Sequence, residues 1–467
     1  MRLRLSLALI CAVAALHGLF FIWYQRPDWH TQWSDQDGYR RLGEVLATTG
    51  TFTRFPDAPR LVPEVLRTPM YPLFLAALYR LFGTGQMPVA LAQTGIFVII
   101  CLVVFSIARR VVSASIALAA AAATALFPPI PYFGALVLTE VWTTFLFTVS
   151  MWLAIRVLRD CVTGMFALLG LLLALTTLSR PVFVLFPIAL AAIGLVLFPI
   201  VRVRARPAIW QWSVMIGVFA VTMLPWFTYN YVTLGRFTLS SAGGIGRGLW
   251  VGSWQATWSG RLQNELTHLA DDIDDRTELD RRVEAIAGRE HLSPGPMLEY
   301  VHQWEDIRRI WVEPVDPYER ALSRVRADQE YLRVALENLR RDPPAHLIKR
   351  LARGVFILWA GEIPFRYSEV NALPPAVIRV CWAIQAVIFA GALVGLVALA
   401  RADRMAEALV LASPLVYITV VHVSLLTEAR QSLPAQPVLL FLATAGAASL
   451  LGHSLALESK IHEGEHL

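Results

Sequence analysis

The chain has little charge and little cysteine for its length of 467 residues. Its charged residues make up 16% of the sequence, whereas a water-soluble domain carries about 25%. None of its 4 cysteines lies in the long polar segments, which argues against a disulfide framework or a CxxC metal site. The formal net charge of +6 does not indicate nucleic acid, because much of the excess is arginine placed beside apolar runs.

Long apolar runs are what the sequence has instead, since 56% of its residues are hydrophobic. Many runs approach the length of about 20 residues that crosses a hydrocarbon core. The first run has no A-x-A-like cleavage site after it, so we interpret it as an uncleaved span. We therefore predict an all-α polytopic membrane protein with about ten transmembrane helices, at 5–24, 87–107, 111–127, 133–155, 164–179, 182–201, 209–230, 373–400, 407–426 and 433–451.

Arginines mark alternate connections between these spans, as at Arg109–Arg110 and Arg401–Arg404, and the short connections between them carry almost none. The positive-inside bias then predicts an inner-membrane protein with both termini cytoplasmic and its long polar segments outside. We divide the chain into an N-terminal membrane module (1–230, with a first outer loop at 25–86), an external, mostly helical segment (231–372) and C-terminal membrane helices (373–467).

Three shorter helices are expected outside the spans. The polar stretch 38–48 predicts a short helix, and the aromatic stretch 68–82 an interfacial segment interrupted by Pro69 and Pro72. In 316–342 the apolar residues recur every three or four positions, which predicts an amphipathic helix.

Two candidates for chemistry lie in the first outer loop. Asp35 and Asp37 are suited to a general base or a metal site, although acids are also favoured in the first turn of a helix. Arg67 opens an aromatic segment, where a guanidinium binds a lipid phosphate or snorkels to headgroups.

Four further charged residues are placed at the same boundary by this topology. Glu140 is an ionisable group at membrane depth and thus a functional candidate, with pairing to Arg180 as the structural alternative. Arg247 follows a glycine-rich stretch that suits an anion, and Arg430 either binds an anion or neutralises Glu428. Together these residues predict a site that handles a lipid phosphate and activates a hydroxyl.

The order of the motifs resembles the membrane glycosyltransferases of the GT-C fold. The closest branch is the bacterial one related to protein O-mannosyltransferases and the lipid A aminoarabinose transferase, glycosyltransferase family 39. The matching motifs are Asp35-x-x-x-Tyr39, Arg67-Thr-Pro-x-Tyr71-Pro72, Leu138-Thr-Glu140, Leu178-Ser-Arg180-Pro181, Pro225-Trp226, Gly243-Gly244 with Leu249-Trp250, and Glu428-x-Arg430.

The resemblance implies an enzyme that takes a sugar from a polyprenyl-phosphate carrier and passes it to an acceptor on the outer face. It implies a catalytic Asp35 with Asp37 as a less certain neighbour, a further acid at Glu140, and a donor phosphate bound by Arg67 with Arg247 or Arg430. Supporting positions are Tyr39, Tyr71 and Arg180. The chain departs from the family at Met70, Tyr229 and Gln431.

The chemistry needs one key carboxylate, because a phosphodiester leaving group requires no general acid, whereas a glycosidase uses two carboxyl groups. Attack in line at the anomeric carbon inverts configuration. The sequence implies no definite cofactor, although two neighbouring acids leave room for a divalent metal. The alternatives are a lipid-linked glycan ligase or polymerase, and a membrane transporter or flippase. Neither the sugar nor the acceptor (a glycolipid, polysaccharide or protein) follows from the sequence.

Overall fold

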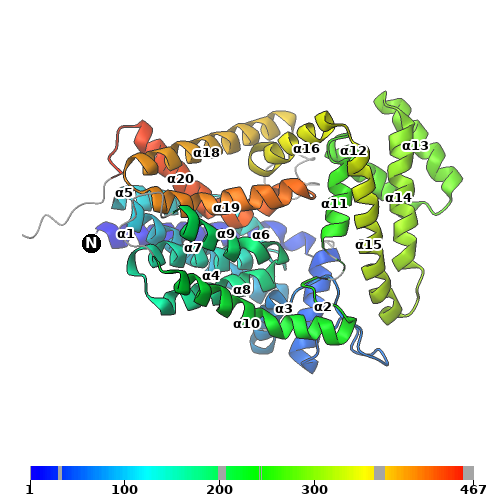
Figure 1. Ribbon diagram of the computed structural model, residues 1–467, viewed down its shortest axis with the longest axis horizontal. Coiled ribbons are helices and arrows are strands. Elements are labelled where there is room, and N and C mark those ends of the chain that lie inside the picture. The colour runs from blue at the N-terminus through cyan, green and yellow to red at the C-terminus, as the bar shows by residue number, and fades with distance from the viewer. Residues whose placement is uncertain are drawn as a thin grey trace, which may run out of the picture.

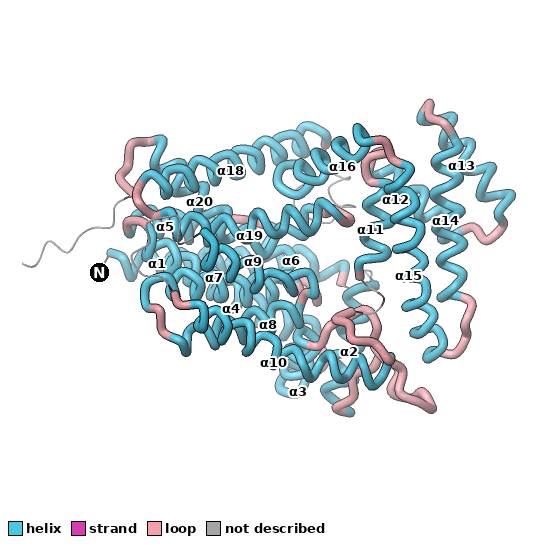
Figure 2. The backbone as a smooth tube through the Cα atoms, in the orientation of Figure 1, coloured by secondary structure: helices cyan, strands magenta, loops and turns pink. Residues whose placement is uncertain are grey.

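A computed structural model describes residues 2–29, 34–197, 207–240, 242, 244–361 and 374–455. The end of the sixth expected span (198–201) and Gly243 lie outside these ranges. The regular elements that are described are helices, and they form two groups whose axes run in different directions (Figures 1 and 2).

The larger group is a bundle of apolar helices that run side by side (Figure 1). Seven helices of the described chain have the length and composition to cross a membrane. They are α1 (Arg2–Gln25), α4 (Gln86–Val111), α7 (Glu140–Asp160), α10 (Ile209–Leu234), α18 (Pro375–Arg401), α19 (Met405–Ser424) and the continuous helical stretch Ala429–Leu450, which comprises η5 (Ala429–Ala435) and α20 (Gln436–Leu450).

The three other expected spans are shorter apolar helices. They are α5 (Ala114–Ala125), α8 (Thr163–Ser179) and the broken helix formed by η2 (Pro181–Leu185), α9 (Phe186–Ala192) and η3 (Ile193–Leu197). Pro181 and Pro187 account for the breaks, because proline donates no backbone hydrogen bond and clashes with the preceding turn. Each of the ten predicted segments therefore contains helix, although the predicted bounds also include short non-helical stretches such as 112–113 and 135–139.

The start of the fourth expected span differs from the prediction. Instead of one helix from residue 133, the chain forms α6 (Pro129–Gly134), a turn, and then α7 from Glu140. Prolines at 129 and 131 suit a helix start but not a helix interior, and a carboxylate at Glu140 is favourable beside the positive end of α7. This break places Glu140 at the tip of a membrane helix.

The smaller group comprises the helices of the segment that we predict to be external, and it is called the external helical segment below. It contains α11 (Ile245–Trp254), α12 (Gly260–Asp272), α13 (Arg276–Glu290), α14 (Pro294–Val312), α15 (Pro317–Arg341), α16 (Pro344–Phe356) and η4 (Ile357–Gly361). Its core is aromatic, with Trp250, Tyr300 and Tyr331 buried against one another. The predicted amphipathic helix at 316–342 is confirmed as α15, which begins where the Asp316 carboxylate accepts from the backbone N–H groups of Tyr318 and Glu319.

The first outer loop links the two groups. It contains η1 (Arg26–Asp28), α2 (Ser34–Thr49), which begins earlier than the predicted residue 38, and α3 (Met70–Phe82). Val62 and Val65 of this loop pack on Ala321 and Val325 of α15. The loop is thus held between the membrane bundle and the external helices.

Small residues allow a close helix contact in the bundle. The sequence motif Gly391-x-x-x-Gly395 on α18 predicts helix packing, and it lies against Gly446 of α20. A Cβ atom added at Gly395 would lie 2.0 Å from the backbone oxygen of Leu442. The helices can approach this closely because Gly395 has no side chain, as small-residue membrane interfaces require.

We predict that Gly395→Ala lowers the free energy of unfolding by about 1–3 kcal/mol, the usual cost of overpacking, because a backbone atom cannot move aside. Gly217→Ala is the matched control, since a Cβ there meets nothing within 4 Å. Thermal unfolding of the purified protein in detergent measures both. Equal unfolding midpoints for Gly395→Ala and the control would contradict this account of the α18–α20 contact.

Candidate active site

A cavity of about 120 Å³ lies where the first outer loop meets the ends of several membrane helices. Its walls come from α2, the loop before α3, the turn before α7, the end of α8 and η5. The lining residues are Asp35, Tyr39, Leu66, Thr68, Leu138, Thr139, Glu140, Ser179, Arg180, Pro181 and Arg430. Segments separated by hundreds of residues in sequence thus bring two acids and two arginines to one small space.

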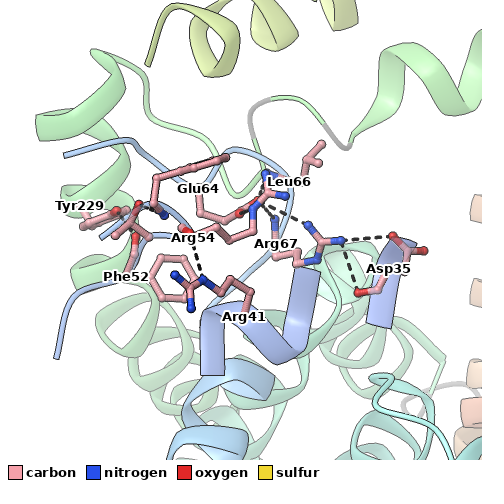
Figure 3. A network of polar contacts seen from close by, with 10 residues as sticks. Asp35, Arg41, Phe52, Arg54, Glu64, Leu66, Arg67 and Tyr229 are labelled. Carbon is pink, nitrogen blue, oxygen red and sulfur yellow. Dashed lines mark hydrogen bonds and ion pairs between the residues drawn. The ribbon is translucent and has the colours of Figure 1, made fainter. Parts of the chain in front are cut away.

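Asp35 and Arg67 form an ion pair beside this cavity (Figure 3). The Nη2 atom of Arg67 lies 3.3 Å from the Asp35 Oδ1 atom and 3.4 Å from its backbone oxygen. The Arg67 side chain is 8% exposed and the Asp35 side chain 53%. Asp35 is therefore the accessible member of the pair, and Arg67 holds it from behind the cavity wall.

Gly38 gives Arg67 the room to reach Asp35. A Cβ atom at Gly38 would lie 2.2 Å from the Arg67 Nη2 atom, so the guanidinium lies directly on the backbone of α2. The next residue, Tyr39, places its ring under the guanidinium, with 4.9 Å from Cζ to the ring centroid. The short sequence Asp35-Gln-Asp-Gly38-Tyr39 thus supplies an anion, a gap and an aromatic face for one arginine.

The tyrosines behind this pair are structural supports. Burial raises the pKa of Tyr39 to about 12, so its phenol stays protonated and cannot serve as a base at neutral pH. Its ring meets Tyr71 edge to face, and the Tyr71 hydroxyl donates to Gln93. Tyr71 therefore fixes Tyr39 without lining the cavity.

Glu64 was not singled out from the sequence, yet it organises the loop that carries Arg67. Its side chain is 1% exposed. One carboxylate oxygen accepts from the backbone N–H groups of Leu66 and Arg67, and the other accepts from Arg54 Nε at 2.8 Å (Figure 3). Glu64 also lies 3.9 Å from Arg67 Nη1. The sequence signal that could have identified Glu64 is its position as a single acid within an apolar stretch, Val62-Pro-Glu64-Val65.

A second cluster of charged side chains forms the opposite wall of the cavity. Glu140 is buried, and its Oε1 atom lies 3.2 Å from Arg180 Nη2 and 3.8 Å from Arg430 Nη1. Arg430 also binds Glu428 at 2.6 Å. The Arg180 Nη1 atom has no hydrogen-bond acceptor among the described residues. This wall therefore presents two guanidinium groups held by the buried Glu140, and one of them also by the partly exposed Glu428.

Asp37 and Arg247 do not line this cavity. The Asp37 side chain is 66% exposed and pairs with Arg40 one turn along α2. Arg247 lies in the first turn of α11, with its guanidinium over the ring of Trp304. Within the described ranges there is no group of three or more His, Cys, Asp or Glu side chains suited to a metal ion. Asp35 and Glu140, the two acids of the cavity, each pair with arginine.

We predict that Glu64→Ala lowers the free energy of unfolding by about 3 kcal/mol, because it leaves the partly buried Arg54 guanidinium and two backbone N–H groups without their acceptor and removes a neighbouring charge from the buried Arg67. Glu64→Gln retains an acceptor oxygen and should lose less. Glu44→Ala is the matched control, since Glu44 is more exposed and its arginine partners lie 3.9 Å away. Thermal unfolding in detergent distinguishes them, and a wild-type midpoint for Glu64→Ala would refute this role.

Comparison with known proteins supports the predicted fold. Residues 66–226 match the sequence model of the family described as dolichyl-phosphate-mannose-protein mannosyltransferase, a range that includes Arg67, Glu140 and Arg180. No curated protein sequence matches the chain significantly. The structure is similar to the oligosaccharyltransferase AglB of Archaeoglobus fulgidus, solved with an inhibitory peptide and a dolichol-phosphate, with a TM-score of 0.52 and 14% identity.

That similarity covers 95% of this chain and 50% of AglB, so the chain spans about half the length of the oligosaccharyltransferase. ArnT of Cupriavidus metallidurans, solved with undecaprenyl phosphate, is 16% identical over 95% of this chain and 78% of ArnT, with a TM-score of 0.38. The family match and the likeness to AglB confirm the predicted all-helical GT-C fold and the predicted resemblance to the mannosyltransferase-related membrane glycosyltransferases.

Proposed function

We propose that the chain transfers a sugar from a polyprenyl-phosphate carrier to a hydroxyl group of an acceptor, with inversion at the anomeric carbon. The observation that carries this proposal is the cavity, which has the Asp35 carboxylate on one wall and Arg180 and Arg430 on another. A base and a cationic wall that face one space are the groups that such a transfer needs. The family matched by residues 66–226 supports the same reaction class.

The cavity suits the reacting end of the donor alone. Its volume of about 120 Å³ is well below the roughly 300 Å³ at which drug-sized pockets begin. The lipid tail then stays in the bilayer, beside helices whose apolar side chains are exposed, such as Val387 and Val397 of α18. The arginine distribution of the short connections supports a site on the non-cytoplasmic face of the inner membrane, with both termini cytoplasmic.

In the proposed reaction the acceptor oxygen forms a bond to the anomeric carbon as the bond from that carbon to the phosphate oxygen breaks. The bonding electrons leave with the polyprenyl phosphate, and the hydroxyl proton passes to the Asp35 carboxylate. Arg180 and Arg430 stabilise the charge that grows on the phosphate. Arg67 acts through Asp35, because its guanidinium holds that carboxylate and does not line the cavity.

We predict that Asp35→Asn lowers turnover by about two to four orders of magnitude, the usual contribution of a positioned base, since the amide keeps the shape but cannot accept a proton. Donor affinity should change little. Asp37→Asn is the matched control, because Asp37 is exposed and pairs with Arg40. Transfer of labelled sugar from polyprenyl-phosphate donors, assayed in membranes that contain each variant, measures the effect. Near-normal turnover of Asp35→Asn would exclude Asp35 as the base.

Steady-state kinetics should distinguish the role of Arg67, which holds Asp35, from that of Arg180, which is proposed to bind the donor phosphate. Gly38→Ala should displace Arg67 and lower kcat, to a value between the wild type and Asp35→Asn, with little change in donor KM. Arg180→Ala should raise donor KM and also lower kcat, since one electrostatic donor contributes about 3 kcal/mol in a transition state. Gly217→Ala again serves as the control. A Gly38→Ala variant that raises donor KM as Arg180→Ala does would instead place Arg67 on the phosphate.

A further inference from the structure

Arg247 and Arg324 both lie in the external helical segment, 77 positions apart in the sequence. They come from α11 and α15, which pack side by side (Figure 1). The crossing is tight, since a Cβ at Gly246 would lie 1.9 Å from the backbone oxygen of Asp328. Asp328 follows Arg324 by one helical turn, and its carboxylate accepts from the backbone N–H of Arg247. The packing of α11 on α15 therefore fixes the backbone positions from which both arginine side chains extend.

Both guanidinium groups lie over tryptophan rings of one helix. Arg247 lies 5.1 Å from the centroid of Trp304, and Arg324 lies 4.3 Å from that of Trp311. The two tryptophans are seven residues apart on α14, which is two turns, so they share a face about 10 Å apart. Stacking on an indole orients a guanidinium and leaves its N–H edge available for an anion.

Neither guanidinium has a carboxylate within 4 Å among the residues that the structure describes, and both groups are at least partly exposed. Many other arginines of this segment are paired, for example Arg289 with Glu265 and Arg333 with Glu330. Burial lowers the pKa of Arg324 to about 10; the charges of Arg54, Arg67 and Arg247 act in the same direction, and that of Glu64 acts against them. Arg324 is thus charged at neutral pH and has other arginines in its surroundings.

Arg324 lies where α15 packs on the first outer loop. Val62 and Val65, which precede Arg67, pack with Ala321 and Val325, which lie three positions before and one position after Arg324 on α15. The pair nevertheless belongs to the segment between α10 and α18, which has no described helix apolar and long enough to span a membrane. A donor phosphate is tied to the bilayer by its polyprenyl tail, so a ligand of this pair must instead approach from the aqueous side.

We propose that Arg247 and Arg324 form a second anion site, which binds a phosphate or carboxylate group of the acceptor. This proposal rests on the proposed transferase function and assigns the acceptor to the class of anionic glycans or glycolipids. It also changes the role expected for Arg247, from donor phosphate to acceptor. The acceptor is then held by its anionic group while a separate hydroxyl reaches Asp35.

The test uses the full chain in lipid nanodiscs saturated with undecaprenyl phosphate, so that the membrane-side cavity is occupied. Inorganic phosphate and glucuronate are titrated separately by calorimetry, which distinguishes the two anion classes. We expect the wild type to bind at least one of them. The double variant Arg247→Gln/Arg324→Gln should bind it about tenfold or more weakly, the worth of one charge-assisted hydrogen bond.

Arg333→Gln is the matched control, since it removes an ion-paired arginine from the same helix and should leave anion binding unchanged. Undecaprenyl phosphate affinity of the double variant should stay within about twofold of wild type, because no contact with the lipid is removed. Should the double variant unfold, the two single variants are measured instead.

Three results would overturn the proposal: no binding of either anion by the wild type, equal anion binding by the double variant, or loss of undecaprenyl phosphate binding in that variant. Failure of the proposed function would give a different result. The Arg180→Ala variant would then bind undecaprenyl phosphate as tightly as the wild type, and its binding of phosphate or glucuronate would also be unchanged.

Discussion

The candidate site depends on one buried cation, the guanidinium of Arg67. Desolvation of a charge is costly unless partners compensate it, and here Asp35 and Glu64 lie on either side while Tyr39 supplies a ring face. The backbone of α2 at Gly38 provides the space. The orientation of Asp35 thus depends on Arg67, which does not line the cavity. The position of the reactive carboxylate therefore depends on the conformation of the first outer loop.

The site has two walls of different origin. The Asp35 wall belongs to a loop outside the membrane bundle, whereas the wall of Glu140, Arg180 and Arg430 is formed at the tips of apolar helices. Each wall pairs acids with arginines internally, so neither needs the other to balance its charge.

Much of the architecture could be predicted from the sequence, because apolar length and arginine asymmetry are local signals. The ten apolar segments, α15 and the Gly391–Gly395 contact follow directly from such patterns. The grouping of Glu140 with Arg180 and Arg430 was expected only from topology and family motifs, and the structure brings these residues together.

Other features could not be predicted, because they depend on contacts between distant segments. Gly38 and Glu64 act through the position of Arg67, and no single-residue pattern shows which arginine a glycine makes room for. The break before α7 follows from prolines, but its consequence for Glu140 requires the packed bundle. Arg324 lies within an ordinary amphipathic helix, and only the packing of α15 in the folded protein places its guanidinium over Trp311, on the same helix as the tryptophan under Arg247.

The packing of the first outer loop on α15 also constrains how the protein is made. Val62 and Val65 contact residues about 260 positions later, and Arg60 binds Asp316 and Glu319 across the same junction. Contacts this distant in sequence form late, since the intervening chain must be ordered first. During synthesis, seven predicted membrane segments precede α15. The loop that carries Asp35 and Arg67 therefore cannot make its contacts with α15 until these segments have been synthesised. The active site is then completed after most of the bundle has been inserted, and a chain that stops before α15 would leave this loop without its external support.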